Sequence, residues 1–372
     1  CELTNVQSGV VYSSSTNSTT LLIKDTNIAT SGTAVGYSGE GELQLSGGTF
    51  NAIDYCLHVT SAQSVKLNNH ASFIGGNYSL FINAPSATLI LDFDEISFNN
   101  TGTLGFFLNP SANASLKTVE ITYPNKRAIQ IEGGAWGFDS LSVSNSPLVQ
   151  GDGGAIHISG ASADFTNCDF TSISANGNGG AVFIDSSYVN FGACDFESNN
   201  ATGTGGAIFV QNMKNNSLSV SGTKFIGNVA AGYGGAVDME TNLANQTYAS
   251  FENVDFEDNI ATNGAAISCC TLNSNCTAVV LYAKNNNTAS FSGNENTLAG
   301  GVDVSCQVTI GEFVTAATDP SASAPSISDS GDEWLMWLVI TLAILLVVGL
   351  IVAAGVGVYF YRKRMSYASL DQ

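Results

Sequence analysis

Acidic side chains are the first residues in this 372-residue chain whose spacing could support chemistry. Asp169, Asp195 and Asp255 occupy one position of a repeated pattern, and Lys224 stands between them in the series. Acids and cations gathered on one sheet would suit an enzyme that acts on acidic sugars. The chain before residue 334 has 30 acidic and 8 basic residues, however, and its formal charge of −22 repels acidic polymers and nucleic acid. We therefore expect a solvated charged face, no enzymatic activity and no nucleic-acid partner.

Metal sites are the next chemistry that these residue types could support. The acidic runs 92–95 and 255–258 could hold a calcium ion, but neither has the ligand spacing of a known calcium loop. The three histidines lie far in the sequence from the cysteines near residues 269–306, which argues against a zinc site. We expect neither a metal nor another cofactor.

Aromatic rings and histidines form a third set, at the middle position of one repeated strand. Rings on an outer face can stack on sugars or on the side chains of a partner, and a contiguous exposed apolar stripe usually marks an interaction site. The alternative is that neighbouring rings stack on one another and only stabilise the fold. The predicted outward binding stripe consists of His58, Phe81, Phe107, His157, Phe183 and Phe209.

All these residues belong to a repeated sequence motif. It reads Gly-Gly-Ala followed by alternating aliphatics, and then Phe-x-x-Asn. Its first aliphatic positions are Ile156, Val182, Ile208, Val237 and Ile267, separated by 26, 26, 29 and 30 residues, and a looser pattern extends in both directions to about twelve units. Short strands with glycine-rich corners predict a parallel β-helix, in which coils stacked about 4.8 Å apart bury a continuous column.

The alternation within each strand predicts which side chains face inward. In Val182-Phe183-Ile184 the outer two residues point into the coil and Phe183 points out. The glycine pairs suit the corners. The asparagines of the second motif can stack amide on amide between coils; they are Asn199, Asn228, Asn259 and Asn294.

Cysteines are expected to stabilise the fold. Cys168 and Cys194 occupy the same inward position in consecutive coils, so they could form a disulfide or a ladder of buried thiols. A second group could close the C-terminal coils, with a connectivity that the sequence leaves open. That group consists of Cys269, Cys270, Cys276 and Cys306, and Cys1 and Cys56 have no assigned partner.

The two motifs in phase resemble the polymorphic outer-membrane-protein repeat of chlamydial autotransporter adhesins, which also occurs in surface proteins of parasitic protists such as trichomonads. Strict copies cover residues 151 to about 294. The chlamydial proteins are anchored by a C-terminal β-barrel, whereas this chain is similar to the membrane-anchored protist type. The resemblance implies a right-handed, single-stranded parallel β-helix at a cell surface that takes part in attachment, and it implies no catalytic residue.

The C-terminal part predicts a membrane anchor. Residues 334–361 contain no charge over 28 residues, which is enough for a transmembrane α-helix. Basic residues 362–364 follow and acidic residues precede, so residues 362–372 are expected in the cytoplasm and residues 1–313, the β-helix of about twelve coils, outside the cell. Residues 314–333 are rich in Ser, Ala and Pro and predict a stalk. The chain has no initiator Met, which indicates a mature form or a piece of a longer protein.

A set of N-glycosylation motifs agrees with an extracellular location of the predicted β-helix. They lie at Asn17, Asn77, Asn99, Asn113, Asn200, Asn215, Asn245, Asn275 and Asn286. In the tail, Tyr367 and Leu370 fit a short sorting pattern bound by clathrin adaptors.

Together these features predict an all-β ectodomain on the plasma membrane, held by a single pass. We expect an adhesin or interaction rod toward a host-cell protein, matrix or glycan. The alternatives are a structural coat or spacer with no specific ligand and, with less support, a pectin-lyase-like enzyme acting on polysaccharide.

Overall fold

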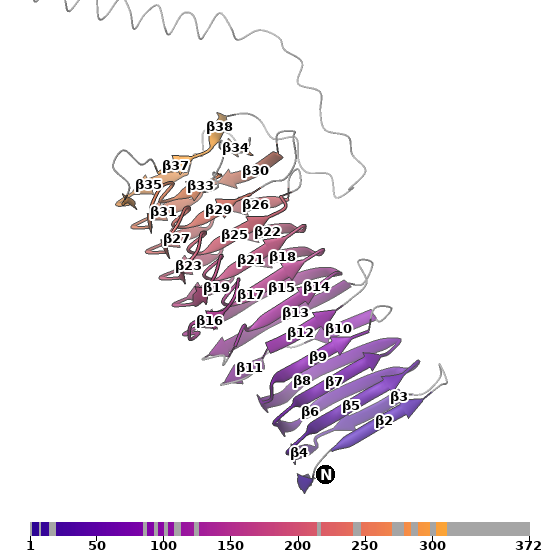
Figure 1. Ribbon diagram of the computed structural model, residues 1–372. Coiled ribbons are helices and arrows are strands. Elements are labelled where there is room, and N and C mark those ends of the chain that lie inside the picture. Colours follow the sequence, from indigo (N-terminus) through magenta and orange to yellow (C-terminus); the bar gives the residue numbers. More distant parts are fainter. Residues whose placement is uncertain are drawn as a thin grey trace, which may run out of the picture. The chain divides into compact units, whose positions relative to one another are not determined.

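The computed structural model describes residues 2–310 except for short internal gaps (Figure 1). The gaps are 7–8, 15–19, 85–87, 93–95, 100–102, 108–112, 123–125, 214–216, 241–246, 270–278, 284–288 and 298–302. The chain divides into two compact units, Cys1–Ala316 and Ala317–Gln372, and all described residues belong to the first. In that described part the secondary structure is entirely strand, and the named strand pairs are parallel. The predicted all-β solenoid is therefore confirmed.

Two long sheets stack successive coils side by side (Figure 1): a twelve-stranded sheet runs along the described solenoid, and a fourteen-stranded sheet begins at β11 (Ile96–Asn99) and continues to its C-terminal side. The twelve-stranded sheet consists of β2 (Val10–Ser14), β5 (Thr33–Gly39), β7 (Tyr55–Ser61), β9 (Tyr78–Asn83), β12 (Thr103–Phe107), β14 (Ile129–Glu132), β17 (Ile156–Ser159), β21 (Val182–Asp185), β25 (Ile208–Gln211), β29 (Val237–Met239), β33 (Ile267–Ser268) and β37 (Val304–Ser305). The fourteen-stranded sheet consists of β11 (Ile96–Asn99), β13 (Asn113–Thr122), β15 (Ala135–Ser144), β18 (Ser162–Thr166), β19 (Asp169–Thr171), β22 (Tyr188–Gly192), β23 (Asp195–Glu197), β26 (Leu218–Ser221), β27 (Lys224–Ile226), β30 (Thr247–Glu252), β31 (Asp255–Glu257), β34 (Val279–Ala283), β35 (Ser290–Ser292) and β38 (Gln307–Ile310).

Two six-stranded sheets complete the coils, one in each half of the solenoid. The N-terminal one consists of β1 (Glu2–Val6), β3 (Thr20–Lys24), β4 (Asn27–Thr30), β6 (Glu42–Ala52), β8 (Ser64–Gly75) and β10 (Thr88–Asp92). The C-terminal one consists of β16 (Val149–Gln150), β20 (Ser174–Asn176), β24 (Asn200–Ala201), β28 (Val229–Ala230), β32 (Ile260–Ala261) and β36 (Glu295–Asn296).

The register of the strict repeats follows the sequence prediction. Ile156 pairs with Val182, Val182 with Ile208, and the series continues through Val237 to Ile267. These aliphatic side chains are buried, because period-two alternation turns them all to the inside of the coil. The phenylalanines of the second motif also stack inside, with ring centroids 4.8 to 5.3 Å apart; they are Phe170, Phe196, Phe225, Phe256 and Phe291.

The register of the less regular coils differs from the prediction. The predicted stripe places Phe107 beside Phe81, but Gly105 is the residue that pairs with Phe81 and with Gln130. A shift by two residues preserves the alternation of apolar and polar side chains, so the sequence pattern cannot distinguish the two frames. Phe107 consequently pairs with Asn83 and Glu132, and its place in the predicted binding stripe was wrong.

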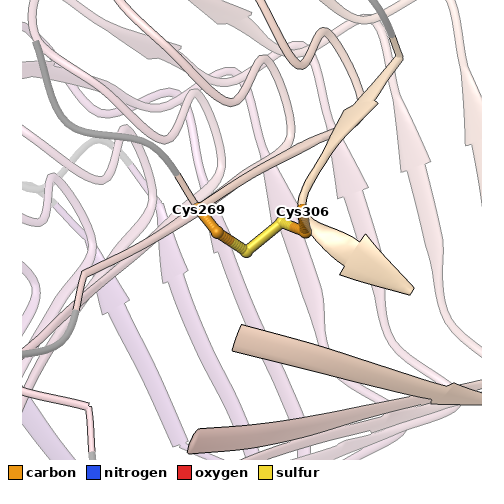
Figure 2. The surroundings of a disulfide bond; sticks show 2 residues. All are labelled: Cys269 and Cys306. Atoms are coloured by element: carbon orange, nitrogen blue, oxygen red, sulfur yellow. A yellow bond between two sulfur atoms is a disulfide. The ribbon is translucent and has the colours of Figure 1, made fainter. Parts of the chain in front are cut away.

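The cysteines near the C-terminal coils form a disulfide between Cys269 and Cys306, whose Cα atoms are 5.1 Å apart (Figure 2). Cys168 and Cys194, in contrast, are buried free thiols, so the disulfide alternative was wrong for this pair. Their Sγ atoms are 3.3 Å from the Thr166 carbonyl oxygen and 3.5 Å from that of Gly192, so each thiol can donate to a carbonyl of its own coil. The pKa of Cys168 is raised by the adjacent Cys194 thiol and by burial.

Several predictions fall outside the described residues. They concern Cys1, Cys270 and Cys276, the stalk 314–333, the apolar segment 334–361 and the tail that contains Tyr367 and Leu370. Among the residues that the structure does describe, no helix has the length and apolar character needed to cross a membrane.

Candidate functional site

The middle residues of the twelve-stranded sheet form a continuous outer column. The strand register aligns Val11, Gly36, His58, Phe81, Gly105, Gln130, His157, Phe183, Phe209, Asp238, Ser268 and Ser305. Five of the six predicted stripe residues therefore lie in one column, and Gly105 takes the place of Phe107. The column differs sharply in exposure along its length.

Most of the C-terminal half of the outer column is covered, although His157 is only half-buried. Phe183 is only 5% exposed and Phe209 only 3%, so the prediction that they form an accessible surface was wrong. The glycine-rich loop before each strand folds over the sheet: a Cβ atom on Gly153 would lie 2.9 Å from the Cβ of Phe183. Gly153 also has a φ of +68°, which side chains rarely adopt, so this close approach depends on glycine.

The covered rings stack on one another. The ring centroids of Phe183 and Phe209 are 5.5 Å apart, and those of His157 and Phe183 are 4.8 Å apart. Burial, and then the nearby Arg127 guanidinium, lower the pKa of His157 to about 4, so this imidazole is neutral at pH 7. For this half of the column, the alternative in which the rings stabilise the coils describes the structure.

The N-terminal half of the outer column carries an island of half-buried rings, here called the aromatic cluster, made of Tyr55, His58, Tyr78 and Phe81. Tyr55 and Tyr78 are nearly parallel, with centroids 5.7 Å apart, and Tyr55 stacks on His58 at 4.5 Å. Phe81 meets His58 and Tyr78 edge to face, at 5.2 and 5.1 Å. Two neighbouring strands, β7 and β9, thus contribute two rings each.

Tyr55 and Tyr78 were missed by the sequence analysis because the alternation breaks at the start of these strands. Cys56 and Leu57 are consecutive and both buried, so Tyr55 and His58 emerge on the same outer face although they are three residues apart. Ser79 and Leu80 repeat this arrangement on β9. The in-phase segments DYCLHV and NYSLFI, at 54–59 and 77–82, contained the signal, since both begin the strand with Tyr.

The rings of the aromatic cluster carry no charge, although the chain as a whole is strongly acidic. Burial lowers the pKa of His58, which keeps its imidazole neutral at pH 7. Two exposed aliphatic side chains precede β7 and β9 in the sequence: Ile53, 63% exposed, lies just before β7, and Ile74, 43% exposed, lies near the end of β8. Lys126 lies at the edge, where its Nζ is 3.2 Å from the Asn77 Oδ1.

Arg127 has a structural role at the junction between the two halves. Its Nε donates to the Gly153 carbonyl oxygen at 3.0 Å and its Nη2 to that of Asp152 at 2.6 Å. Burial lowers the pKa of this guanidinium. Its Nη1 donates to the Gln130 Oε1 at 3.5 Å, and the two bonds to backbone oxygens anchor the first glycine-rich loop.

The acidic column has the predicted register. Asp169 pairs with Asp195, Lys224 follows, and Asp255 comes next, all exposed on the fourteen-stranded sheet. Burial, and then the charge of Asp195, raise the pKa of Asp169. Among the described residues, no three His, Cys, Asp or Glu side chains converge where a metal ion could bind.

Two of the predicted glycosylation residues have described side chains. Asn77 and Asn200 are exposed, and the backbone nitrogen of Asn77 donates to the Ile53 carbonyl oxygen at 2.9 Å. The other seven lie at positions where the side chain is not among those described: Asn17, Asn99, Asn113, Asn215, Asn245, Asn275 and Asn286.

Comparison with known proteins gives no relative from which a function could be transferred. No family model, no curated protein and no solved structure matches the chain. The resemblance to the polymorphic outer-membrane-protein repeat stays a prediction from the motifs. The aromatic cluster is therefore the feature from which a function can be inferred.

Proposed function

We propose that the chain is a cell-surface interaction protein that binds a glycan through the aromatic cluster. The observation that carries this proposal is a contrast along the outer column: glycine-rich loops cover Phe183 and Phe209, whereas Tyr55, His58, Tyr78 and Phe81 are only half-buried. Leaving such apolar area in water is unfavourable unless a ligand uses it. Rigid rings held by strands lose little entropy when they bind.

The chemistry of the cluster favours a neutral sugar face. Four uncharged rings provide apolar area, and the tyrosine hydroxyls provide polar groups at its edge. The formal charge of −22 before residue 334 disfavours an acidic polymer. A protein with an apolar patch is the other occupant that the rings and the two exposed isoleucines could accommodate.

The setting of the site is proposed from the sequence. The uncharged run 334–361, followed by basic residues, supports a single transmembrane helix with the solenoid outside the cell. The repeat resemblance supports a right-handed β-helix of about twelve coils as the extracellular part. This topology would place the aromatic cluster outside the cell, where a ligand can reach it.

The full chain in lipid nanodiscs, exposed to a panel of neutral and acidic glycans, tests the proposal. We expect saturable binding to a neutral glycan. Combining Tyr55→Ala with Tyr78→Ala should lower the affinity by about five-fold to about 150-fold, because each ring contact is worth about 0.5–1.5 kcal/mol. Tyr188→Ala is the matched control, since Tyr188 is an exposed tyrosine on the other long sheet. Unchanged binding by the double variant would exclude the cluster as the site.

Absence of saturable glycan binding would favour one of the alternatives. Binding of a host-cell protein that is lost in the same double variant would show that the cluster binds protein instead. If neither ligand binds, the structural coat or spacer is the better description, and the covered stack of Phe183 and Phe209 favours that role for the C-terminal half. Cleavage of uronic-acid polymers would support the enzyme.

A further inference from the structure

Asp238 is a buried carboxyl group in the covered half of the outer column. It lies on β29, where the register places it between Phe209 and Ser268. The residue is 0% exposed, and neither of its carboxyl oxygens has a hydrogen-bond partner. An ionised carboxylate without a partner is strongly disfavoured in such a place, so an acid at this position needs a physical explanation.

A glycine-rich segment, residues 231–235, closes over this carboxyl and is here called the cover loop. A Cβ atom on Gly234 would lie 2.7 Å from the Cβ of Asp238, and Gly234 has a φ of +62°. The cover loop is held by backbone hydrogen bonds to its neighbours in the stack: Gly234 N donates to Asn263 O and Gly235 N to Gly264 O, each at 3.2 Å. With the cover loop in this position, no part of Asp238 is exposed to water.

The charges around Asp238 do not compensate its ionised form. The described groups that act on the carboxyl are the Thr204 and Ser268 hydroxyls, the Met239 amide and the half-buried Glu240, and none of them is a cation. The pKa of Asp238 is raised to about 7, chiefly by burial; the Thr204 and Ser268 hydroxyls oppose this rise and the neighbouring Glu240 adds to it. The pKa of Glu240 is itself raised by burial.

We propose that the cover loop is a pH-sensitive lid over the outer column, closed while Asp238 is neutral and opened when this carboxyl releases its proton to water. The neutral acid can stay buried beneath Gly234, whereas the carboxylate must be hydrated and so favours the open loop. Opening would expose the Asp238 carboxyl on the outer face of β29 to water. This inference is independent of the proposed glycan binding.

The sign of the pH dependence follows from the pKa of Asp238 under the closed loop and its pKa when the loop is open. The closed pKa of about 7 lies above the value of about 3.9 expected in water, so opening becomes more favourable as pH rises between these values and levels off above pH 7. Between about pH 5.5 and about pH 8, the opening equilibrium should rise about thirty-fold.

Hydrogen exchange of the full chain measures this opening. The protection factors of the Gly234 and Gly235 amides, corrected for the intrinsic pH dependence of exchange, should fall about thirty-fold over that interval. The matched control is the loop with Gly153 and Gly154, whose amides bond to the next coil but which covers the neutral ring of Phe183. Its protection factors should stay constant.

Two variants distinguish the lid from a general loosening of the coils. Asp238→Asn keeps the shape of the side chain but cannot ionise, so its cover loop should show no pH dependence. Asp238→Ser introduces the residue type found at the next position of the column, at Ser268, and should behave in the same way. Constant protection in the wild type, an equal fall in the control loop, or persistence of the fall in both variants would overturn the proposal.

Discussion

At the scale of single residues, the buried asparagines of the second motif make the most complete set of hydrogen bonds. Each amide bonds to the next coil: Asn199 Nδ2 donates to Asn228 Oδ1 at 2.9 Å, and Asn228 Nδ2 donates to Asn259 Oδ1 at 3.0 Å. The backbone nitrogens of Asn199 and Asn228 also donate to these amide oxygens, at 3.1 and 3.0 Å. Because water does not reach these groups, the hydrogen bonds of each buried amide depend on the amide of the next coil.

We expect Asn228→Ala to destabilise the solenoid by about 3 kcal/mol, because it leaves the buried donors of Asn199 and the Phe196 carbonyl oxygen without their partner. Urea unfolding of the full chain measures the change. Asn176→Ala is the control: its exposed Nδ2 is 3.0 Å from Gln150 Oε1, and its loss should cost less than about 0.5 kcal/mol. Equal effects of the two substitutions would contradict the importance of burial.

At the scale of the elements, the stack of phenylalanines joins β19, β23, β27, β31 and β35 into one column. Phe225 is fully buried between Phe196 and Phe256, with centroids 4.9 and 5.0 Å away. Phe291 lies at the end of the stack, 5.3 Å from Phe256, and is 40% exposed. Equivalent positions of β27 and β35 therefore hold a phenylalanine that is buried in the first strand and partly exposed in the second.

Phe225→Ala should lower the free energy of unfolding by about 3–5 kcal/mol, because it removes a buried ring and leaves a cavity. The paired strands on either side keep their positions, so the cavity cannot close. Phe291→Ala should cost less than about 2 kcal/mol, since solvent already reaches that ring. Thermal or urea unfolding of both variants measures the difference. A smaller effect at Phe225 than at Phe291 would show that the ring stack does not carry the stability of this sheet.

At the scale of the whole solenoid, the ends determine how the stack begins to unfold. Each coil contacts its neighbours along the stack, so unfolding can start at a terminal coil and propagate inward. The Cys269–Cys306 disulfide spans 37 residues and joins β33 to the coil that contains β37 (Figure 2). It therefore resists fraying at the C-terminal side of the described solenoid.

Replacing both cysteines, Cys269→Ser with Cys306→Ser, should weaken the C-terminal coils by about 3–4 kcal/mol, the loop-closure effect of a link of this length. Hydrogen exchange should accelerate at the amides of β33 and β37 and stay unchanged at β17 and β21, far along the stack. A reducing agent should reproduce the effect in the wild type and have none on the double variant. Uniform acceleration along the solenoid would contradict local fraying.

The strict repeats show how much of the fold could be predicted from sequence. The phrase around Val182 gave the strand, its inward side chains and its pairing with Ile156 and Ile208, because two motifs repeat in phase and leave one register. Around Phe107 only the alternation was present, and a two-residue shift satisfied it equally well. The candidate site was predicted in part: His58 and Phe81 were found, and Tyr55 and Tyr78 were missed.

The sequence by itself determined the parallel solenoid, the repeat period and the faces of the strands, because these properties follow from local alternation and from spacing that recurs along the chain. Only the tertiary structure decided which outward residues are accessible. Phe183 and Phe81 share one column, yet a loop covers the first and leaves the second half-exposed. Alternation specifies the side of the strand on which a ring lies, but burial depends on which backbone passes over that ring, and the alternation does not encode the path of the backbone.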